Sequence, residues 1–497
     1  MPASTDRRRP RRGTAVAPLG SLLVLFLPGF CNPLAHASPS TSSGWHPPPT
    51  PSTHRPLLNG ALETQEVVSS WWSPWPSQGW GPCVGPKATP VLPKNTPGFV
   101  QVFLDGGSAN REWGMCFLSQ ICDAVAVAKI LNATLVVPHL EVNPVWKDSS
   151  TFGDIFDVDK FIEVLEDEVP IVRSLPEEIK TAPVRASADW YLENVLPVLR
   201  RYGIAAISPF SHRLQLRCKV NFQALTFVPH IVDLGEALVE RLRNPVHLET
   251  RVASESPQGP SNKSAGRFVA LHLRFDKDMV AHSACDFGGG KAEKLALARY
   301  RKHLWHGRLL NSQFTNKELR KKGRCPLTPE EIGLMLAAMG FDGTLASSLP
   351  PTRGESMNYA PQVYGGRAQL APLRKLFPLM EDKRSLASEE ELGRVNGRAS
   401  LLAAVDYYVS IHSDIFVSAS PSNMHNAVVG SRTYGGLKTI RPDMALLGRL
   451  FLNKTLGWEE FRRMVRAGHG SGQRQITLRM EKQSIYTYPA PDCMCRV

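Results

Sequence analysis

The sequence predicts an α/β protein built from two Rossmann-like domains that face a cleft. Two observations support this prediction. Strand-like and helix-like segments alternate from residue 98 onward, and the polar stretch 249–266 interrupts the alternation once. A strand, a helix and a second strand in that order form a βαβ unit, which makes the two strands parallel. At 497 residues the chain is long enough for two cores, so each part is expected to build its own parallel sheet.

The first domain is predicted to begin with a βαβ unit. Phe99–Leu104 is expected to be a strand, Ile121–Leu131 a helix and Thr134–Leu140 the next strand. Asp105, Gly106 and Gly107 follow the first strand and predict a tight loop. Further elements are expected at 159–164, 190–201 (helix), 204–207 (strand) and 232–243 (helix).

The second domain is organised around Phe268–Phe275, which alternates on the two-residue period of a buried strand. On that period His272 and Arg274 share one face. Ligands of open α/β sheets bind at the carboxyl ends of the strands, and a guanidinium placed there can bind two oxygens of a phosphate. The alternative is that Arg274 forms an ion pair with Asp276 or Asp278 and has no other role.

A second candidate phosphate site follows the strand Ile415–Val417. The loop 418–423 leads from that strand into a helix that starts at Met424, so free backbone N–H groups and the helix dipole favour an anion there. Ordinary capping by Ser420 or Ser422 explains the same residues. Asp414, just before the strand, could accept hydrogen bonds from a base or a ribose, or it could be a solvated turn carboxylate.

Two further helices are predicted in the second domain. Thr328, Pro329 and Glu331 have the spacing of an N-cap, a first helical residue and a capping-box partner. A helix over Leu401–Val409 precedes the strand at Ile415.

The net charge of +13 suggests nucleic acid or an anionic surface as a partner. Five of these charges belong to an arginine cluster in residues 7–12, directly before an apolar stretch, which is typical of membrane topology. No interleaved aromatic and basic motif accompanies the charge, so no nucleic-acid partner is predicted.

The apolar stretch lies within residues 13–37. It is short for a spanning helix, which needs about 20 residues, and Ala35-His36-Ala37 offers a cleavage site, so it is either a secretory signal peptide or a single-pass anchor. Both alternatives place the remaining chain in the lumen. The sequons at Asn132, Asn262 and Asn453 agree with this placement.

The cysteines also agree with an oxidising compartment. With Cys31 of the apolar stretch set aside, eight remain, an even number that is typical of disulfide pairing. Cys493 and Cys495 have no second Cys/His pair at metal-ligand spacing, so we reject a zinc site and expect a disulfide that staples the tail. No metal site is predicted.

Four longer motifs resemble those of a known family. Together they resemble the plant O-fucosyltransferase-like family of glycosyltransferases over residues 98–452. The motifs are His-x-Arg-Phe-Asp-Lys-Asp-Met with the following Ala281–Gly290, Ile121–Pro138, Gly323–Gly333 and Ser413–Pro421.

The resemblance implies the GT-B architecture and a nucleotide sugar in the cleft, with GDP-fucose as the first choice. It implies that Arg274 binds the pyrophosphate while His272 orients the donor, and that no metal is needed because Arg274 and helix amides stabilise the leaving diphosphate. The donor side would also include Asp276, Asp414, Ser418, Ser420, Ser422 and Asn423.

The sequence departs from the family pattern in three places. The family supplies the acceptor side through a short Gly-Gly-x-Asn-Gln-x-Arg loop, whereas Gly106–Gln120 is longer and offers Gly106, Gly107 and Asn110 without the Asn-Gln pair. A Pro/Ser-rich insert at Gly343–Pro361 stands where a strand is expected, and Ser422 stands where glycine is usual. Asp105 could be the general base toward an acceptor hydroxyl, or it could cap the glycine loop.

The resulting prediction is a Golgi membrane glycosyltransferase with a lumenal catalytic domain, which transfers fucose from GDP-fucose to a hydroxyl of a protein or a cell-wall glycan. The alternatives are a UDP-rhamnose-dependent pectin rhamnosyltransferase, a catalytically weakened lectin-like or scaffolding member, and a soluble secretory-pathway protein after signal cleavage. The predicted segments are a basic cytosolic tail (1–12), the signal or anchor (13–37), a Pro/Ser-rich disordered stem (38–97), the acceptor-side domain (98–250), the nucleotide-sugar domain (264–452) and a C-terminal tail (453–497).

Overall fold

A computed structural model gives the structure of most of the chain beyond residue 98. The described residues are 21–26, 79–83, 92, 96, 98–104, 116–142, 148–175, 214–244, 267–288, 290–305, 314–341, 344–348, 363–419, 422–470, 476–481 and 483–496. Below, the first half means the described residues of 98–244 together with the strand at 21–26 that pairs with them, and the second half means the described residues of 267–470.

The first half contains a parallel sheet in the order β1-β3-β4-β6, with β5 also paired to β3. The helix α2 (Cys116–Leu131) connects β3 to β4, which confirms the predicted βαβ unit. The strands are β1 (Ser21–Phe26), β3 (Gly98–Leu104), β4 (Thr134–Val136), β5 (His139–Leu140) and β6 (Ile171–Val172).

Two boundaries in this half differ from the sequence-based expectation. The predicted strand Thr134–Leu140 is divided into β4 and β5 around Pro138, a residue with no N–H to give to a ladder. Helix α2 begins at Cys116 rather than Ile121, so the last five residues of the long Gly106–Gln120 segment are helical and not loop. Leu118 and Gln120 are already buried in this first part of the helix.

The other elements of the first half are helical. They are α3 (Phe152–Ile155), α4 (Val158–Leu165), α7 (Leu214–Lys219), a π-helical turn (Val220–Ala224) and α8 (Pro229–Arg243). The elements predicted at 190–201 and 204–207 and the boundary at 249–266 lie outside the described residues.

The second half contains a five-stranded parallel sheet in the order β11-β10-β7-β8-β9. From β7 the chain adds β8 and β9 on one side and then returns to add β10 and β11 on the other side. This is the order of a doubly wound Rossmann sheet, and its topological switch point lies between β7 and β10. The strands are β7 (Val269–His272), β8 (Thr344–Ser348), β9 (Leu379–Glu381), β10 (Ile415–Ser418) and β11 (Lys438–Ile440).

Strand β8 corrects one expectation. The segment Gly343–Pro361 was interpreted as an insert that replaces a strand, but Thr344–Ser348 is a strand that pairs in parallel with both β7 and β9. Its serines and alanine give little strand signal by themselves. Two neighbouring strands supply the pairing partners, and those partners are distant in the sequence.

Helices cover both faces of this sheet. Their bounds are α10 (Lys277–His282), α11 (Lys291–Trp305), α12 (Asn316–Lys321), α13 (Pro329–Met339), α14 (Gly366–Leu376), α15 (Lys383–Leu386), α16 (Glu389–Gly393), α17 (Ala399–His412), α18 (Asn423–Tyr434), α19 (Met444–Leu452) and α20 (Trp458–Gly470). The predicted capping box of α13 is confirmed, because Glu331 N donates to Thr328 Oγ1 and Thr328 N donates to the Glu331 carboxylate.

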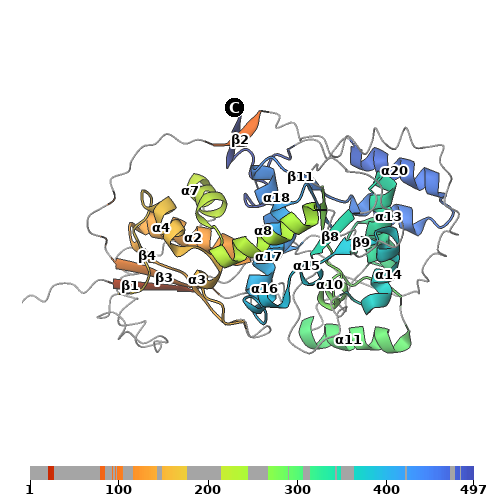
Figure 1. Cartoon of the computed structure of the whole chain (residues 1–497), viewed down its shortest axis with the longest axis horizontal. Helices are drawn as coiled ribbons and strands as arrows, with labels where there is room; N and C mark the ends of the chain where they lie inside the picture. Colours follow the sequence, from red (N-terminus) through yellow and green to blue (C-terminus); the bar gives the residue numbers. More distant parts are fainter. Residues whose placement is uncertain are drawn as a thin grey trace, which may run out of the picture.

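The two halves share a hydrophobic core. Helices α8 and α17 lie between the two sheets in the middle of the molecule (Figure 1). Ala270 and Phe416 belong to the same core cluster as the first sheet, whereas Val269, Leu271 and Val417 belong to a second cluster on the other face. The predicted alternation along β7 is therefore confirmed, and one face of the second sheet completes the core of the first half.

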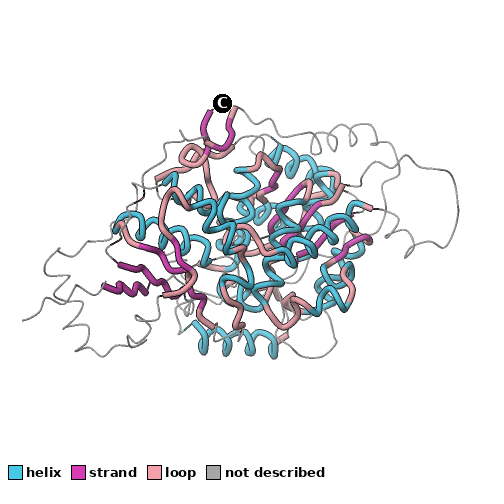
Figure 2. The backbone as a smooth tube through the Cα atoms, turned by 60° about the vertical axis from the view of Figure 1, so that its left-hand side comes forward, coloured by secondary structure: helices cyan, strands magenta, loops and turns pink. Residues whose placement is uncertain are grey.

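The C-terminal segment does not end as a free tail. Strand β12 (Met494–Arg496) pairs with β2 (Trp80–Pro82) in an antiparallel ladder at the edge of the molecule (Figure 2). Disulfides join Cys83 to Cys495 and Cys218 to Cys493, which confirms that disulfides staple the tail. The predicted stem is consequently ordered at Trp80–Cys83, and the Arg496 guanidinium lies 5.5 Å from the centre of the Trp80 ring.

Two further findings concern the cysteines and the N-terminus. Cys122 is free and buried, so the expectation that all eight cysteines pair is wrong.

Ser21–Phe26, inside the predicted signal or anchor segment, pairs with β3 as β1, while the rest of 13–37 lies outside the described residues. Among the described residues, no helix combines the length and the apolar character needed to cross a bilayer.

Candidate functional site

The switch point of the second sheet brings two predicted donor residues together. His272 is the last residue of β7 and Ser418 the last residue of β10, and they lie opposite each other in the parallel register. Both are buried, at 6% and 2% exposure. Strand β7 was predicted to continue to Phe275 but ends at His272, so Arg274 lies beyond the ladder, at the carboxyl edge where ligands of such sheets bind.

Ser422 connects β7 to helix α18. Its Oγ accepts a hydrogen bond from His425 N at 3.0 Å, so it caps the helix as the capping alternative predicted. The same oxygen lies 3.2 Å from His272 Nε2. The N-terminus of α18 is therefore fixed to the end of β7 by one hydroxyl. Asn423 is the first residue of α18, and Ser420 lies outside the described residues.

Two histidines at this edge are held neutral. Burial lowers the pKa of His272 to about 3, and the positive charge of Arg274 contributes to the shift. Burial also lowers the pKa of His425 to about 3, with a contribution from Arg441. His425 Nδ1 is buried and has no hydrogen-bond partner among the described residues. His425 could not be singled out from the sequence, because a histidine inside a helix carries no local signal of a site.

Arg274 is buried and paired. Its side chain is 10% exposed and Nη1 lies 2.6 Å from Asp276 Oδ2, so the ion pair of the alternative hypothesis is present. Asp276 also caps α10, because its Oδ1 accepts from Met279 N at 2.8 Å. Arg274 Nε remains buried with no hydrogen-bond partner in the described part of the chain. The ion pair therefore leaves part of the guanidinium unsatisfied.

A buried cation and a buried carboxylate lie on the same face of the sheet. Lys383 Nζ is 2.5 Å from Asp406 Oδ2, and the two side chains are 9% and 10% exposed. They line a narrow pocket together with Ala270 of β7, with Glu381 at the end of β9 and with Asp382, which follows it. Burial raises the pKa of Asp406, while the ammonium group of Lys383 opposes that shift. Sequence analysis missed this pair because its members are 23 residues apart and belong to different helices, α15 and α17.

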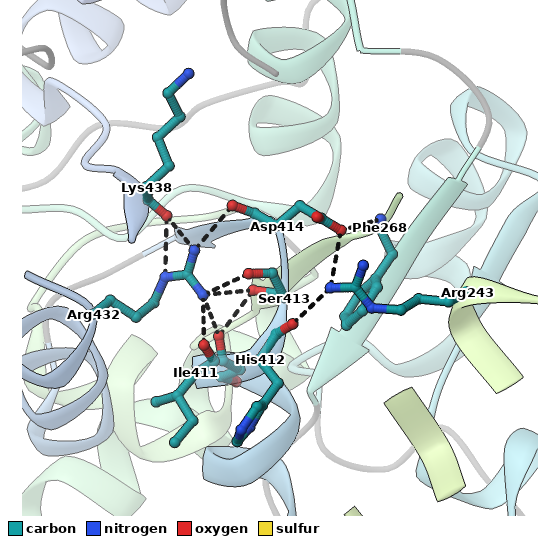
Figure 3. Close-up of polar contacts among 9 residues, drawn as sticks. Arg243, Phe268, Ile411, His412, Ser413, Asp414, Arg432 and Lys438 are labelled. Atoms are coloured by element: carbon teal, nitrogen blue, oxygen red, sulfur yellow. Dashed lines mark hydrogen bonds and ion pairs between the residues drawn. The ribbon is translucent and has the colours of Figure 1, made fainter. Parts of the chain in front are cut away.

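Asp414 lies at the opposite edge of the sheet. It precedes β10, and its Oδ2 accepts from Phe268 N at 3.0 Å and lies 3.5 Å from Arg243 Nη2 (Figure 3). Its carboxylate thus joins the beginnings of β7 and β10. The expectation that Asp414 contacts a base or a ribose does not fit this position, since ligands of such sheets bind at the carboxyl ends.

Arg432 is fully buried beside Asp414 and binds backbone carbonyls instead of a carboxylate (Figure 3). Burial lowers the pKa of this guanidinium to about 9. It joins the end of α17, the start of β10 and the start of β11 to helix α18. The carbonyl acceptors belong to Ser410, Ile411, Ser413, Asp414 and Lys438.

A second pocket, of about 350 Å³, lies at the carboxyl edge of the first sheet. Val136 and Val137 line it after β4, and Arg173 and Ser174 line it after β6, with His139 at its side. The predicted acceptor loop follows β3 of the same sheet. Its residues Asp105, Gly106, Gly107 and Asn110 lie outside the described residues.

The predicted glycosylation sites that the structure describes are both exposed. Asn132 lies in the turn after α2, in a left-handed conformation with φ of 54°. Asn453 ends α19, and its Oδ1 accepts hydrogen bonds from Thr455 N and Oγ1. Asn262 lies outside the described residues. Within the described chain, no group of three or more His, Cys, Asp or Glu side chains is placed to hold a metal ion.

Comparison with known proteins identifies the family. A family model described as GDP-fucose protein O-fucosyltransferase matches residues 118–435. O-fucosyltransferase 39 and O-fucosyltransferase 31 of Arabidopsis thaliana are each 55% identical to the chain, over 96% and 97% of it respectively and over 97% of each relative. A solved structure of POFUT1 in complex with GDP aligns at 14% identity and a TM-score of 0.32, over 68% of this chain and 95% of that chain, and a likeness of this size supports no argument. The family model and the identity to both relatives show that the chain belongs to the O-fucosyltransferase family of glycosyltransferases.

Proposed function

We propose that this glycosyltransferase transfers fucose from GDP-fucose to a hydroxyl of a protein or a cell-wall glycan. The observation that carries the proposal is the switch point between β7 and β10. It combines Arg274, neutral His272 and the capped start of α18 at one edge of a Rossmann sheet. Relatives that are 55% identical over nearly the whole chain are O-fucosyltransferases by name, which supports fucose as the first choice of sugar.

The diphosphate of the donor would lie between Arg274 and the N-terminus of α18. Arg274 Nε is buried without a hydrogen-bond partner among the described residues. Leaving a buried donor unsatisfied costs roughly 1–3 kcal/mol, and a phosphate oxygen would remove that cost. Asp276 holds the guanidinium in place, and the backbone N–H groups at the start of α18 favour negative charge.

The transfer itself needs an acceptor, a base and a stabilised leaving group. The acceptor oxygen forms a bond to C1 of fucose while the bond from C1 to the phosphate oxygen breaks, and GDP leaves with the electron pair. The proton of the acceptor hydroxyl passes to a base, for which Asp105 is the candidate. Arg274 and the helix amides would stabilise the charge on the departing diphosphate without a metal ion.

The two halves would then act as the two domains of a GT-B enzyme. The second half has the strand order of a doubly wound nucleotide-binding sheet, which suits the donor. The pocket beyond β4 and β6 at the carboxyl edge of the first sheet suits the acceptor, because Gln101, His139, Thr151, Arg173 and Ser174 in its lining offer hydrogen-bonding groups. Lys383 and Asp406 would line the inner side of the donor site.

The enzyme would work in the lumen of the secretory pathway, in the Golgi, with residues 13–37 as its anchor or as a cleaved signal, and either role requires that Ser21–Phe26 give up its pairing with β3. The disulfides Cys83–Cys495, Cys218–Cys493 and Cys285–Cys325 suit an oxidising compartment. The sequons at Asn132 and Asn453 are exposed, as glycosylation requires.

Endoglycosidase treatment of the protein expressed in a eukaryotic cell tests this location. Treatment should increase the electrophoretic mobility of the wild-type protein. It should leave the triple variant Asn132→Gln, Asn262→Gln, Asn453→Gln unchanged. An unchanged wild-type band would contradict the lumenal location.

Substitution of Arg274 tests the donor site. Lysine cannot form two parallel hydrogen bonds with a diphosphate, so Arg274→Lys should already weaken GDP binding. A hydrogen bond to a charged group contributes about 1.5–3 kcal/mol, so the loss should be roughly 10- to 150-fold. Arg274→Ala should abolish transfer while the protein still folds. Calorimetric titration with GDP, together with a thermal melt of the same sample, measures both quantities.

Arg432→Lys is the matched control, because Arg432 is buried in the same half but bonds only to the protein. It should lower the melting temperature and leave the GDP affinity of the folded fraction intact. A wild-type GDP affinity in Arg274→Ala, with a lower melting temperature, would return Arg274 to the role of a structural ion pair. Titration with UDP-rhamnose and GDP-mannose distinguishes the possible donors.

A further inference from the structure

The surface formed by α12 and α19 carries six exposed cationic side chains. The two helices cross closely: a Cβ at Gly448 would lie 1.9 Å from the carbonyl oxygen of Arg320, so only glycine permits this approach. Lys317 and Lys321 are one turn apart on α12 and therefore share a face. The six residues are Lys317, Lys321, Lys322, Arg324, Arg449 and Lys454, and we call them the α12–α19 surface.

These charges are not neutralised by the protein. None of the six takes part in an ion pair within the described part of the chain. Two of them are held by an aromatic ring: Lys322 Nζ lies 3.6 Å and the Arg324 guanidinium 5.3 Å from the centre of Phe314. Glu318 on α12 is exposed and forms the capping box with Thr315. The surface therefore presents a net positive charge to solvent.

The α12–α19 surface is connected to the candidate donor site. Leu327 lies three residues after Arg324. Its backbone N–H donates a hydrogen bond to the carbonyl oxygen of Ala419, the residue that follows β10. The disulfide Cys285–Cys325 and the bond from Asp286 N to Asn316 Oδ1, at 3.0 Å, fix α12 to the segment that follows α10. The segment that follows α12 is thus bonded to the residue after β10, at the carboxyl edge of the sheet where Arg274 lies.

We propose that the α12–α19 surface binds an acidic glycan, a polymer whose sugars carry carboxylates. The proposal rests on the proposed transferase function, because an acceptor glycan must pass beside the donor site. A chain of regularly spaced carboxylates complements a fixed array of cations. A bilayer is a poorer match, because the exposed large apolar side chains of the described residues lie on other elements and none lies on α12 or α19.

The test measures binding of a galacturonate oligomer to the full lumenal protein, without turnover. The charge-reversal variant Lys317→Glu, Lys321→Glu, Arg449→Glu, Lys454→Glu removes four cations that form neither an ion pair nor a cation–π contact within the described part of the chain. The matched control reverses four exposed cations on α14 and after α16: Arg367→Glu, Arg374→Glu, Lys375→Glu and Arg394→Glu. Both variants change the net charge equally. All proteins carry Asn453→Gln, so that a glycan beside Lys454 does not cover the surface.

The charge-reversal variant of the α12–α19 surface should lose about tenfold or more in affinity for the galacturonate oligomer, whereas the control variant should keep the wild-type affinity. Added salt should weaken the binding of the oligomer to the wild-type protein. A neutral glucan oligomer should not bind. An equal loss in both variants, equal binding of the neutral oligomer, or binding of anionic vesicles but not of the galacturonate oligomer would overturn the proposal. GDP titration separates the two ideas: intact GDP binding without galacturonate binding leaves the transferase function standing, and absent GDP binding in the wild-type protein contradicts that function itself.

Discussion

His272 and His425 are both neutral at the edge of the sheet where a diphosphate would bind, and the reason is burial. A protonated imidazole would need solvent or an acid beside it, whereas Arg274 and Lys383 act on His272 with positive charge. Neutral histidines leave the positive charge of the site to the Arg274 guanidinium. A neutral ring nitrogen of His272 can also keep its contact with Ser422 Oγ.

The two histidines make the stability of the fold dependent on pH. Their folded-state pKa of about 3 lies below the ordinary value of about 6.5. Between these values the unfolded chain binds more protons than the folded chain. The free energy of unfolding should therefore decrease as the pH falls from about 6.5 toward 3, by up to about 1.4 kcal/mol per pH unit for each histidine.

Urea unfolding at a series of pH values measures this slope. His425→Gln removes one titrating group and should reduce the slope across that window. His412→Gln is the control, because His412 is exposed and lies at the other edge of the sheet, as the last residue of α17. A slope that is the same in His425→Gln and in the wild-type protein would contradict the neutral, buried state of His425.

At the scale of the elements, helix α17 depends on a carboxylate from the other half. Its own N-cap residue, Arg398, makes no side-chain cap. Asp148 of the first half caps the helix instead, because its Oδ2 accepts hydrogen bonds from Ser400 N and Ser400 Oγ, each at 2.6 Å. Its Oδ1 accepts from Ser150 N and Oγ. Burial alone would raise the pKa of Asp148, but these hydrogen bonds outweigh it and lower the pKa.

Asp148→Asn should therefore destabilise the protein. An amide offers one acceptor oxygen where the carboxylate offers two, so two of the four donors lose their acceptor. Hydrogen bonds to a charged group contribute about 1.5–3 kcal/mol each, so the loss of two should lower the free energy of unfolding by roughly 3–6 kcal/mol. Urea unfolding at neutral pH checks this value.

Arg398→Gln is the control for Asp148→Asn. It breaks the Arg398–Asp154 ion pair, which also joins the start of α17 to the first half but is exposed, with side chains 49% and 34% accessible. An exposed pair contributes about 0–1 kcal/mol. Equal losses in the two variants would show that Asp148 acts only as a surface contact.

At the scale of the whole molecule, disulfides join the segment around Cys83 to the C-terminal segment and join the C-terminal segment to α7 of the first half. The segment after α20 returns to α7 and α18, where Arg217 Nε donates to Tyr486 Oη at 2.9 Å and the Tyr486 carbonyl lies against Gly430. The Cys218–Cys493 disulfide spans 275 residues, and Cys285–Cys325 spans 40. The Cys218–Cys493 disulfide closes the longer loop and therefore lowers the conformational entropy of the unfolded chain more.

Removal of Cys218–Cys493 should thus destabilise the protein more than removal of Cys285–Cys325. Chain-entropy estimates give a difference of roughly 1–2 kcal/mol, since the stabilisation increases with the logarithm of the loop length. The double variants Cys218→Ser, Cys493→Ser and Cys285→Ser, Cys325→Ser leave no unpaired thiol from the broken bond. Urea unfolding of both compares them directly, and a larger loss from the shorter loop would contradict the entropic explanation.

The sequence alone determined most local features of this protein. Apolar alternation placed β7 and assigned His272 to the face that the structure shows, and the spacing of Thr328 and Glu331 placed the start of α13. These features depend on neighbours a few residues away, so they leave a local pattern. The long motifs around Arg274 were specific enough to indicate the family before any fold was known.

Tertiary structure decided everything that depends on distant partners. The register of β7 with β10 brought Ser422 to His272 and moved Asp414 to the opposite edge. Strand β8 exists because two strands flank it, although Thr344–Ser348 has little strand signal of its own. Pairing between residues that are tens or hundreds of positions apart is set by packing and hydrogen bonding in the folded chain, and no local pattern in the sequence records it.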